Sequence, residues 1–157
     1  MKTKTTITEL TKEDLVNLLS GALYGSPYLS AEYDVSVEYD EDDSYEEIMA
    51  NILLNGGAIK VTDSYADGCF FGSLRHESNE DNDATYHVRY IDILNGLEKA
   101  ANGTFNTCPE VGEVFAERNA AFARQSFKAF AHYESAWDAV TADCLMQIIL
   151  FNEIVYG

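Results

Sequence analysis

The pattern that most constrains the fold lies near the end of the chain. Between about residues 136 and 155, apolar residues recur at the three- and four-residue spacing of one helix face. This stripe comprises Trp137, Val140, Cys144, Ile148 and Phe151, and Leu145 and Ile149 widen it. A helix with so broad an apolar surface needs neighbours on several sides. We therefore expect it to be the central helix of the core, with the first helix or a sheet packed on it.

Local start and stop signals divide the rest of the chain into short helices and strands. Thr11 and Ser44 each precede an acidic residue at the capping-box position, and each begins a predicted helix that ends near a glycine. Two more helices are expected, from Tyr90 or Asp92 to about Gly103 and from Thr107 to about Tyr133. Predicted strands cover residues 32–40, 58–62, 69–74 and 85–90, and the polar segment 76–83 is expected to be a loop. The chain of 157 residues is thus expected to form one α+β domain, residues 1–157, with a small antiparallel sheet and four to five helices.

The segment from Glu32 to Glu47 has nine carboxylates and no Lys, Arg or His. Its first half alternates, which predicts a half-buried strand with Tyr33, Val35, Val37 and Tyr39 on one face and acidic residues on the other. Carboxylates two residues apart on a strand are separated by roughly 6.8 Å, which is comparable to the phosphate spacing of a nucleic-acid strand. The segment is therefore a candidate mimic of a phosphate array.

The overall composition favours an acidic binding protein over a nucleic-acid-binding one. The 27 acidic and 10 basic residues give a formal net charge of −17. Such a charge repels nucleic acid and anionic membranes and is compatible with a basic partner. The alternative is that the charge serves only solubility or salt tolerance.

Three widely spaced cysteines, Cys69, Cys108 and Cys144, form no disulfide pattern, and they fit a reducing cytosol. The first residues lack an apolar signal core, and no apolar run reaches about 18 residues. We therefore expect a cytoplasmic protein.

No motif in the sequence indicates catalysis, a cofactor or a metal. Asp63 to Gly68 superficially resembles a calcium loop, but its third position is Tyr65 and its twelfth is Leu74, neither of which fits. The histidines and cysteines lack zinc-ligand spacing, and Cys144 lies on the apolar stripe. There is no phosphate-binding loop, dinucleotide fingerprint or nucleophile elbow. We predict no catalytic residue, no cofactor and no metal.

Tyrosines cluster around the acidic segment. Tyr24, Tyr28, Tyr33, Tyr39 and Tyr45 lie in or near it. Their rings can face the core with the hydroxyls reaching water. Alternatively, they are interface anchors ringed by carboxylates, which suits an Arg-rich surface.

The two ends of the chain resemble a family of short acidic proteins from bacterial phages, plasmids and conjugative elements. Thr11 and Asp14 with Ala22-Leu23 and Gly25 are similar to the family's opening helix, and Gly56-Gly57 with the following strand is similar to its glycine pair. Ala142-Asp143, Gln147 and residues 150–157 resemble its terminal LFGEIVYG block, with Asn152 in place of a glycine. The resemblance implies a mobile element in a bacterial host cell, where small acidic proteins often block CRISPR or restriction systems.

These observations lead to one functional hypothesis and one alternative. The hypothesis is a non-enzymatic anti-CRISPR or antirestriction inhibitor, a DNA mimic that occupies the Lys/Arg groove of a CRISPR effector or restriction enzyme. The alternative is an interaction or structural accessory module in which tyrosines carry the binding. The predicted partner-binding residues are Glu32, Asp34, Glu38, Asp40, Glu41, Asp42, Asp43, Glu46 and Glu47, with Tyr33, Tyr39 and Tyr45. Glu77, Glu80, Asp81 and Asp83 are candidates for an extension of the surface.

Overall fold

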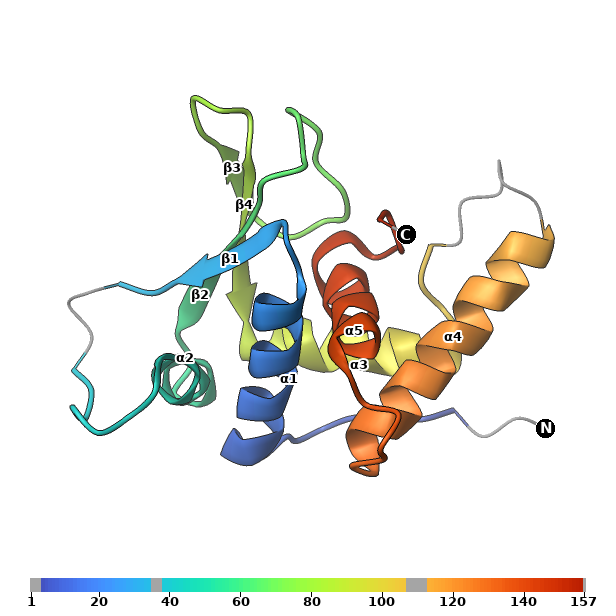
Figure 1. Ribbon diagram of the computed structural model, residues 1–157, viewed down its shortest axis with the longest axis horizontal. Coiled ribbons are helices and arrows are strands. Elements are labelled where there is room, and N and C mark those ends of the chain that lie inside the picture. The colour runs from blue at the N-terminus through green and yellow to red at the C-terminus, as the bar shows by residue number, and fades with distance from the viewer. Residues whose placement is uncertain (1–3, 35–37, 107–112, 157) are drawn as a thin grey trace.

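A computed structural model describes residues 4–34, 38–106 and 113–156, and it confirms the predicted α+β class (Figure 1). In chain order the elements are α1 (Lys12–Gly25), β1 (Leu29–Glu32), α2 (Tyr45–Leu54), β2 (Ala58–Asp63), β3 (His76–Ser78), β4 (Ala84–Arg89), α3 (Tyr90–Asn102), α4 (Glu113–Ala131) and α5 (Ala139–Phe151).

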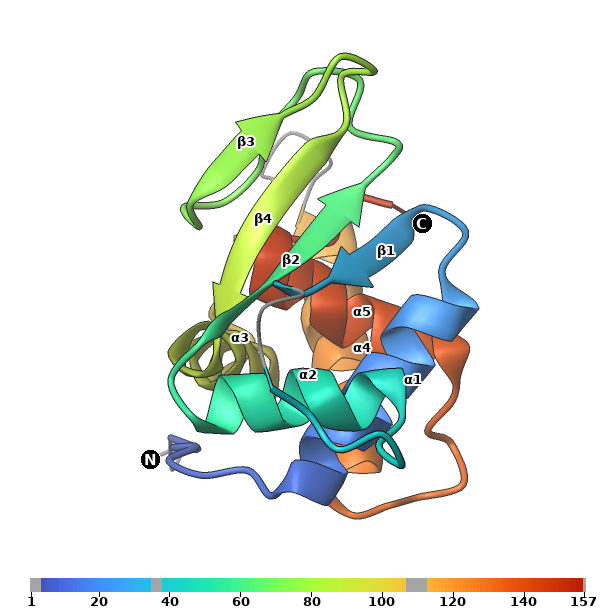
Figure 2. The same ribbon diagram turned by 90° about the vertical axis from the view of Figure 1, so that its left-hand side faces the viewer.

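The four strands form one antiparallel sheet in the order β1-β2-β4-β3. Successive side chains along each strand point to opposite faces of the sheet, so the two faces carry different residues. The inner face carries Ile59, Val61, Tyr86 and Val88, all of which are buried. The helices α1, α3, α4 and α5 lie behind this inner face, so the outer face of the sheet is left open (Figures 1 and 2).

Helix α5 is the centre of the core, as its apolar stripe predicts. It packs against α1, α3 and α4, and all its residues from Cys144 to Phe151 are buried. Two members of the predicted stripe differ, because Val140 is exposed and Trp137 precedes the helix. Two glycines allow this close packing. A Cβ atom added at Gly96 of α3 would lie 2.6 Å from the Cα atom of Ile149, and one at Gly21 of α1 would lie 2.7 Å from the Cβ atom of Ala142.

The predicted helix starts at Thr11 and Ser44 are confirmed. The Thr11 hydroxyl accepts a hydrogen bond from the Asp14 amide at 3.1 Å, and the Asp14 carboxylate accepts one from the Thr11 amide at 2.9 Å. Ser44 and Glu47 form the same reciprocal pair at 3.2 Å in each direction. Each pair satisfies two amides that the first helical turn cannot satisfy itself.

The predicted strand over residues 32–40 is confirmed only at Glu32 and is wrong for the other described residues, 33–34 and 38–40. Strand β1 ends at Glu32, which is paired with Lys60, and β2 begins only two residues earlier, at Ala58. The described residues 33–34 and 38–40 are irregular, so alternation alone does not make a strand. Residues 35–37 lie outside the described part of the chain.

Two other predicted segments are corrected. Residues 69–74 form a loop because Asp67, Gly68 and Gly72 have positive φ angles of 48°, 80° and 74°, which interrupt an extended chain. Part of the expected loop 76–83 is instead strand β3, which pairs with β4.

Helix α4 ends close to its expected end near Tyr133, whereas α5 is shorter than predicted at both ends and begins at Ala139 rather than near Ala136. Helix α4 ends at Ala131, and its expected start at Thr107 lies outside the described residues. Helix α5 ends at Phe151 rather than near Val155, because Asn152 adopts a left-handed conformation with φ 58°. Asparagine is the residue after glycine that best tolerates this conformation. The tail after it brings the ring of Tyr156 to within 4.6 Å of the ring of Tyr28, centroid to centroid, just before β1 begins.

Candidate interaction surface

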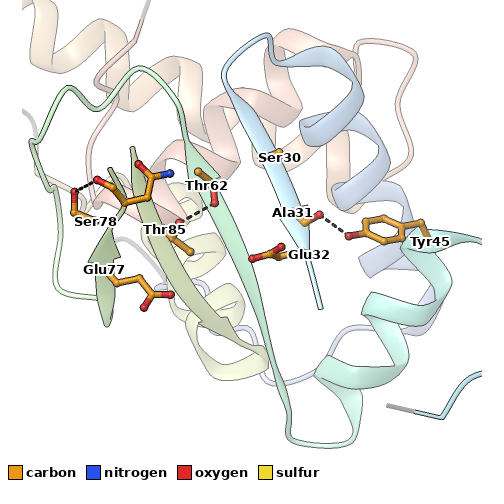
Figure 3. Close-up of a pocket in the computed structure, with 9 residues that line it drawn as sticks. Ser30, Ala31, Glu32, Tyr45, Thr62, Glu77, Ser78 and Thr85 are labelled. Atoms are coloured by element: carbon orange, nitrogen blue, oxygen red, sulfur yellow. Dashed lines mark hydrogen bonds between the residues drawn. The ribbon is translucent and has the colours of Figure 1, made fainter. Parts of the chain in front are cut away.

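The open outer face of the sheet contains a shallow polar groove of about 740 Å³ (Figure 3). It extends from the start of α2, across β1, β2 and β4, to β3. Its walls are hydroxyl, amide and carboxylate groups, from Ser30, Ala31, Glu32, Tyr45, Thr62, Glu77, Ser78, Asn79 and Thr85. Because strand residues alternate between faces, the side chains of Ser30, Glu32, Thr62, Glu77 and Thr85 share the face that the helices do not cover.

Cross-strand pairs order the floor of the groove. Thr62 on β2 lies opposite Thr85 on β4, and their hydroxyl oxygens are 2.8 Å apart. The Lys60 ammonium and the His87 ring nitrogen Nε2 each lie 3.5 Å from a carboxylate oxygen of Glu77. Glu32 is paired in register with Lys60 but forms no salt bridge within the described residues. The face therefore carries mixed charge, with an acidic residue at each side.

The acidic segment continues from this groove along one end of the molecule. Asp34 follows β1, and the residues from Glu38 to Asp43 form an irregular loop and turn before α2. The side chains of Glu38, Asp40, Glu41 and Asp42 are exposed. The turn itself is held by the Asp40 carbonyl, which accepts a hydrogen bond from the Asp43 amide at 3.0 Å.

The last two carboxylates of the segment have structural roles. Glu46 is buried and accepts a hydrogen bond from the exposed Tyr24 hydroxyl. Glu47 caps α2 and lies 3.7 Å from the Lys12 ammonium. The Ser44 hydrogen bonds, helped by Lys12, lower the pKa of Glu47. These two residues are therefore less available to a partner than the loop carboxylates.

Three tyrosines connect the groove with the acidic loop. The ring of Tyr33 is half-buried and lies 5.0 Å from the ring of Tyr45 and 6.2 Å from that of Tyr39, measured between centroids. The Tyr45 hydroxyl donates a 2.6 Å hydrogen bond to the Ala31 carbonyl (Figure 3). This bond occupies an acceptor on the free edge of β1. Tyr39 is 53% exposed and Tyr45 40%, so both rings can also contact a partner.

A second acidic region lies at the opposite end of the open face, in the turn between β3 and β4 (Figure 2). Its acidic residues are Glu77, Glu80, Asp81 and Asp83. The side-chain oxygen Oδ1 of Asn79 accepts hydrogen bonds from the backbone amides of Asp81 at 3.0 Å and Asp83 at 2.9 Å. The two acidic regions are far apart in sequence, and the tertiary fold places the polar groove between them.

The predicted carboxylate array at strand spacing is not found in the described part of the segment, where only Glu32 belongs to a strand. The structure instead brings Glu32 and Glu77 to one face. Sequence reasoning missed the groove residues Ser30, Thr62, Ser78, Asn79 and Thr85. The alternation of Lys60 and Thr62 with buried Ile59 and Val61 was the signal that could have indicated a polar outer face.

Among the residues described, no three or more His, Cys, Asp and Glu side chains are grouped so that they could hold a metal ion. None of the described helices combines the length and apolar character that crossing a bilayer requires.

Comparisons with protein-family models, with curated proteins and with solved structures found no match to this chain.

Proposed function

We propose that this protein is a non-enzymatic inhibitor that binds the Lys/Arg-rich surface of a nucleic-acid-binding complex and competes with the nucleic acid. The observation that carries the proposal is the concentration of exposed carboxylates in the loop 38–42, next to a polar groove and two exposed tyrosines. Carboxylates held on a folded scaffold can replace phosphates in salt bridges with Arg and Lys.

The proposed target class is a CRISPR effector or a restriction enzyme in the cytoplasm of a bacterial host. This part of the proposal is supported by the resemblance of the chain ends to acidic proteins of mobile elements. The chemistry is compatible with it because such targets hold nucleic acid in positively charged channels. Binding would be fast and sensitive to salt, since screening acts over about 8 to 10 Å at ordinary ionic strength.

The first experiment is a pull-down from bacterial lysate with the tagged protein, repeated at high salt and with excess duplex DNA. We expect a nucleic-acid-binding complex that both salt and DNA displace. A partner that remains bound in both conditions would contradict competition with nucleic acid.

A charge-reversal variant and a matched control then test whether the acidic loop 38–42 is the binding surface. The double variant Glu41→Lys and Asp42→Lys reverses two exposed charges and keeps Asp40, whose carboxylate accepts a hydrogen bond from the Asp42 amide at 3.1 Å. The control, Glu117→Lys with Glu134→Lys, makes the same change in net charge on and just after α4. We expect the first variant to bind the captured complex at least about tenfold more weakly at low salt. Equal losses in both variants would show that net charge matters and this surface does not.

A second candidate function, an interaction module anchored by tyrosines, is favoured by the exposure of Tyr39 and Tyr45. Exposed aromatic anchors next to a polar rim are typical of binding hot spots. For this candidate, Tyr39→Ala would weaken binding more than charge reversal does, and the affinity would change little between low and high salt.

A further inference from the structure

A second concave site lies on the helical side of the molecule, away from the open sheet face. It is a cavity of about 640 Å³ bounded by α4, α5, the start of β1 and the C-terminal tail. Its lining combines one carboxylate, Asp143, with the rings of Tyr28, Tyr65 and Tyr156. None of its lining residues is Lys, Arg or His.

The carboxylate in this cavity is held in place by neutral donors. One oxygen of Asp143 accepts hydrogen bonds from the Ser26 hydroxyl at 2.6 Å and the Tyr28 hydroxyl at 2.5 Å. The other oxygen accepts a 2.7 Å hydrogen bond from the Gln147 side-chain amide. A carboxylate has about four acceptor positions, so one remains for a further donor. Within the described part of the chain no cationic side chain pairs with Asp143.

The three tyrosine rings form one cluster beside this carboxylate. The Tyr28 and Tyr65 rings are stacked with centroids 5.2 Å apart, and Tyr156 lies edge-on to both, at 4.6 and 5.9 Å. Tyr28 is buried, whereas Tyr65 is 54% exposed and extends the cluster to the surface. Aromatic faces attract cations, and the attraction grows when water is excluded.

We propose that this cavity binds an arginine side chain of a protein partner. A guanidinium is planar, so it can stack on a tyrosine ring while an N–H donates to the free acceptor position of Asp143. The methylene groups of arginine would lie against apolar side chains of the lining, such as Phe122 and Val140. The net charge of −17 draws a basic partner to the molecule. This site is separate from the surface of the proposed function, and its test does not depend on that function.

The test is an NMR titration of the full chain with N-acetyl-arginine-methylamide, with the citrulline analogue as the neutral control of nearly equal shape. The reporters are the backbone amides of Val155 and Tyr156, which donate to Gln147 beside Asp143. For a ligand of this size we expect a dissociation constant on the order of millimolar. Shifts with the arginine compound and none with the citrulline compound would support the proposal. Equal shifts with both, or none with either, would overturn it.

Two variants locate the binding site. A titration of the wild type with the corresponding lysine analogue tests whether the site prefers arginine. Tyr65→Ala removes an exposed ring and is expected to weaken arginine binding about fivefold. Asp143→Asn removes the charge and is expected to abolish binding, with the amide spectrum showing whether the tail stays folded. The control variant Glu134→Gln, outside the cavity, should bind as the wild type does. Wild-type binding by Tyr65→Ala, or equally tight binding of the lysine analogue, would overturn the assignment to an arginine side chain.

Discussion

The phenolic hydroxyl of Tyr156 donates a hydrogen bond to Oδ2 of Asp63 across 2.7 Å, joining the C-terminal tail to the end of β2. Asp63 is fully buried, and its other oxygen accepts the Tyr65 amide at 2.9 Å. Burial raises the pKa of Asp63, although these two hydrogen bonds act in the opposite direction. Burial and the nearby Asp63 carboxylate likewise raise the pKa of Tyr156.

Asp63→Asn should therefore change how stability depends on pH. Folding raises the pKa of the Asp63 carboxyl above its unfolded-state pKa near 3.8. The folded state therefore becomes less stable as the pH rises above 3.8, because the charged carboxylate is disfavoured in the folded protein. Asparagine carries no such charge. The free energy of unfolding of the variant minus that of the wild type should therefore be highest at pH 7. This difference should decrease as the pH falls through the folded-state pKa towards 4. Urea unfolding at several pH values measures the difference. Asp67→Asn, at an exposed site, is the control, and a difference independent of pH would contradict the prediction.

Gln147 is expected to be the main attachment of the tail to α5. Its side-chain oxygen accepts the amides of Val155 and Tyr156, both at 2.8 Å, and it is almost completely buried. Gln147→Met keeps the side-chain size but leaves these amides without partners. We expect a loss of about 2–4 kcal/mol in the free energy of unfolding, with faster hydrogen exchange at both amides. Gln125→Met, exposed on α4, should change stability by less than about 0.5 kcal/mol. Unchanged exchange at Val155 and Tyr156 would contradict this role.

Gly96 sets the distance between α3 and α5. A Cβ atom there would lie 2.5 Å from Cγ1 and 2.6 Å from Cα of Ile149, and the second contact involves backbone that cannot rotate away. Gly96→Ala should cost about 1–3 kcal/mol of stability, even though alanine favours helix. The neighbouring exposed substitution Asn95→Ala should be neutral or slightly stabilising by comparison. Denaturant unfolding of both variants checks this, and a stabilised Gly96→Ala protein would show that the helices are less closely packed.

The thiols of Cys69 and Cys144 should differ strongly in reactivity. Cys69 is exposed, whereas Cys144 is buried in α5, and burial raises the pKa of its thiol to about 12. Because the thiolate is the reactive form, Cys144 should be labelled only when the protein unfolds. The measurement is labelling with an aromatic disulfide at pH 8, followed by mass spectrometry. Replacing Cys69 and Cys108 by serine leaves Cys144 as the single thiol. That variant should react in urea and not in buffer, and rapid labelling in buffer would contradict a buried thiol.

Several features of this fold follow from short stretches of sequence. The capping boxes at Thr11 and Ser44 form as their spacing predicts, because each hydrogen-bonds only to residues three positions away. The apolar stripe of α5 likewise predicts its central place, since residues that need burial on several sides can only lie between other elements.

The candidate surfaces depended on contacts between distant segments. Alternation favoured a long acidic strand, but β1 ends at Glu32, opposite Lys60 of β2, and the described residues 33–34 and 38–40 are irregular. Glu32 on β1 and Glu77 on β3 line the same groove because the strands are arranged in the order β1-β2-β4-β3. Neither acidic segment by itself predicts this order. The cavity that we propose to bind arginine needs Tyr28 and Asp143, which are 115 residues apart.

By itself, the sequence determined the fold class, the starts of α1, α2 and α3, the central helix and the accumulation of negative charge, since these depend on composition and on neighbours a few residues away. Only the tertiary structure decided which carboxylates are exposed, which serve as caps, and which, like Asp63 and Asp143, are held by distant hydroxyl groups. The physical reason is that burial and hydrogen bonding of a side chain depend on the elements packed around it, and the position of those elements is a property of the whole chain.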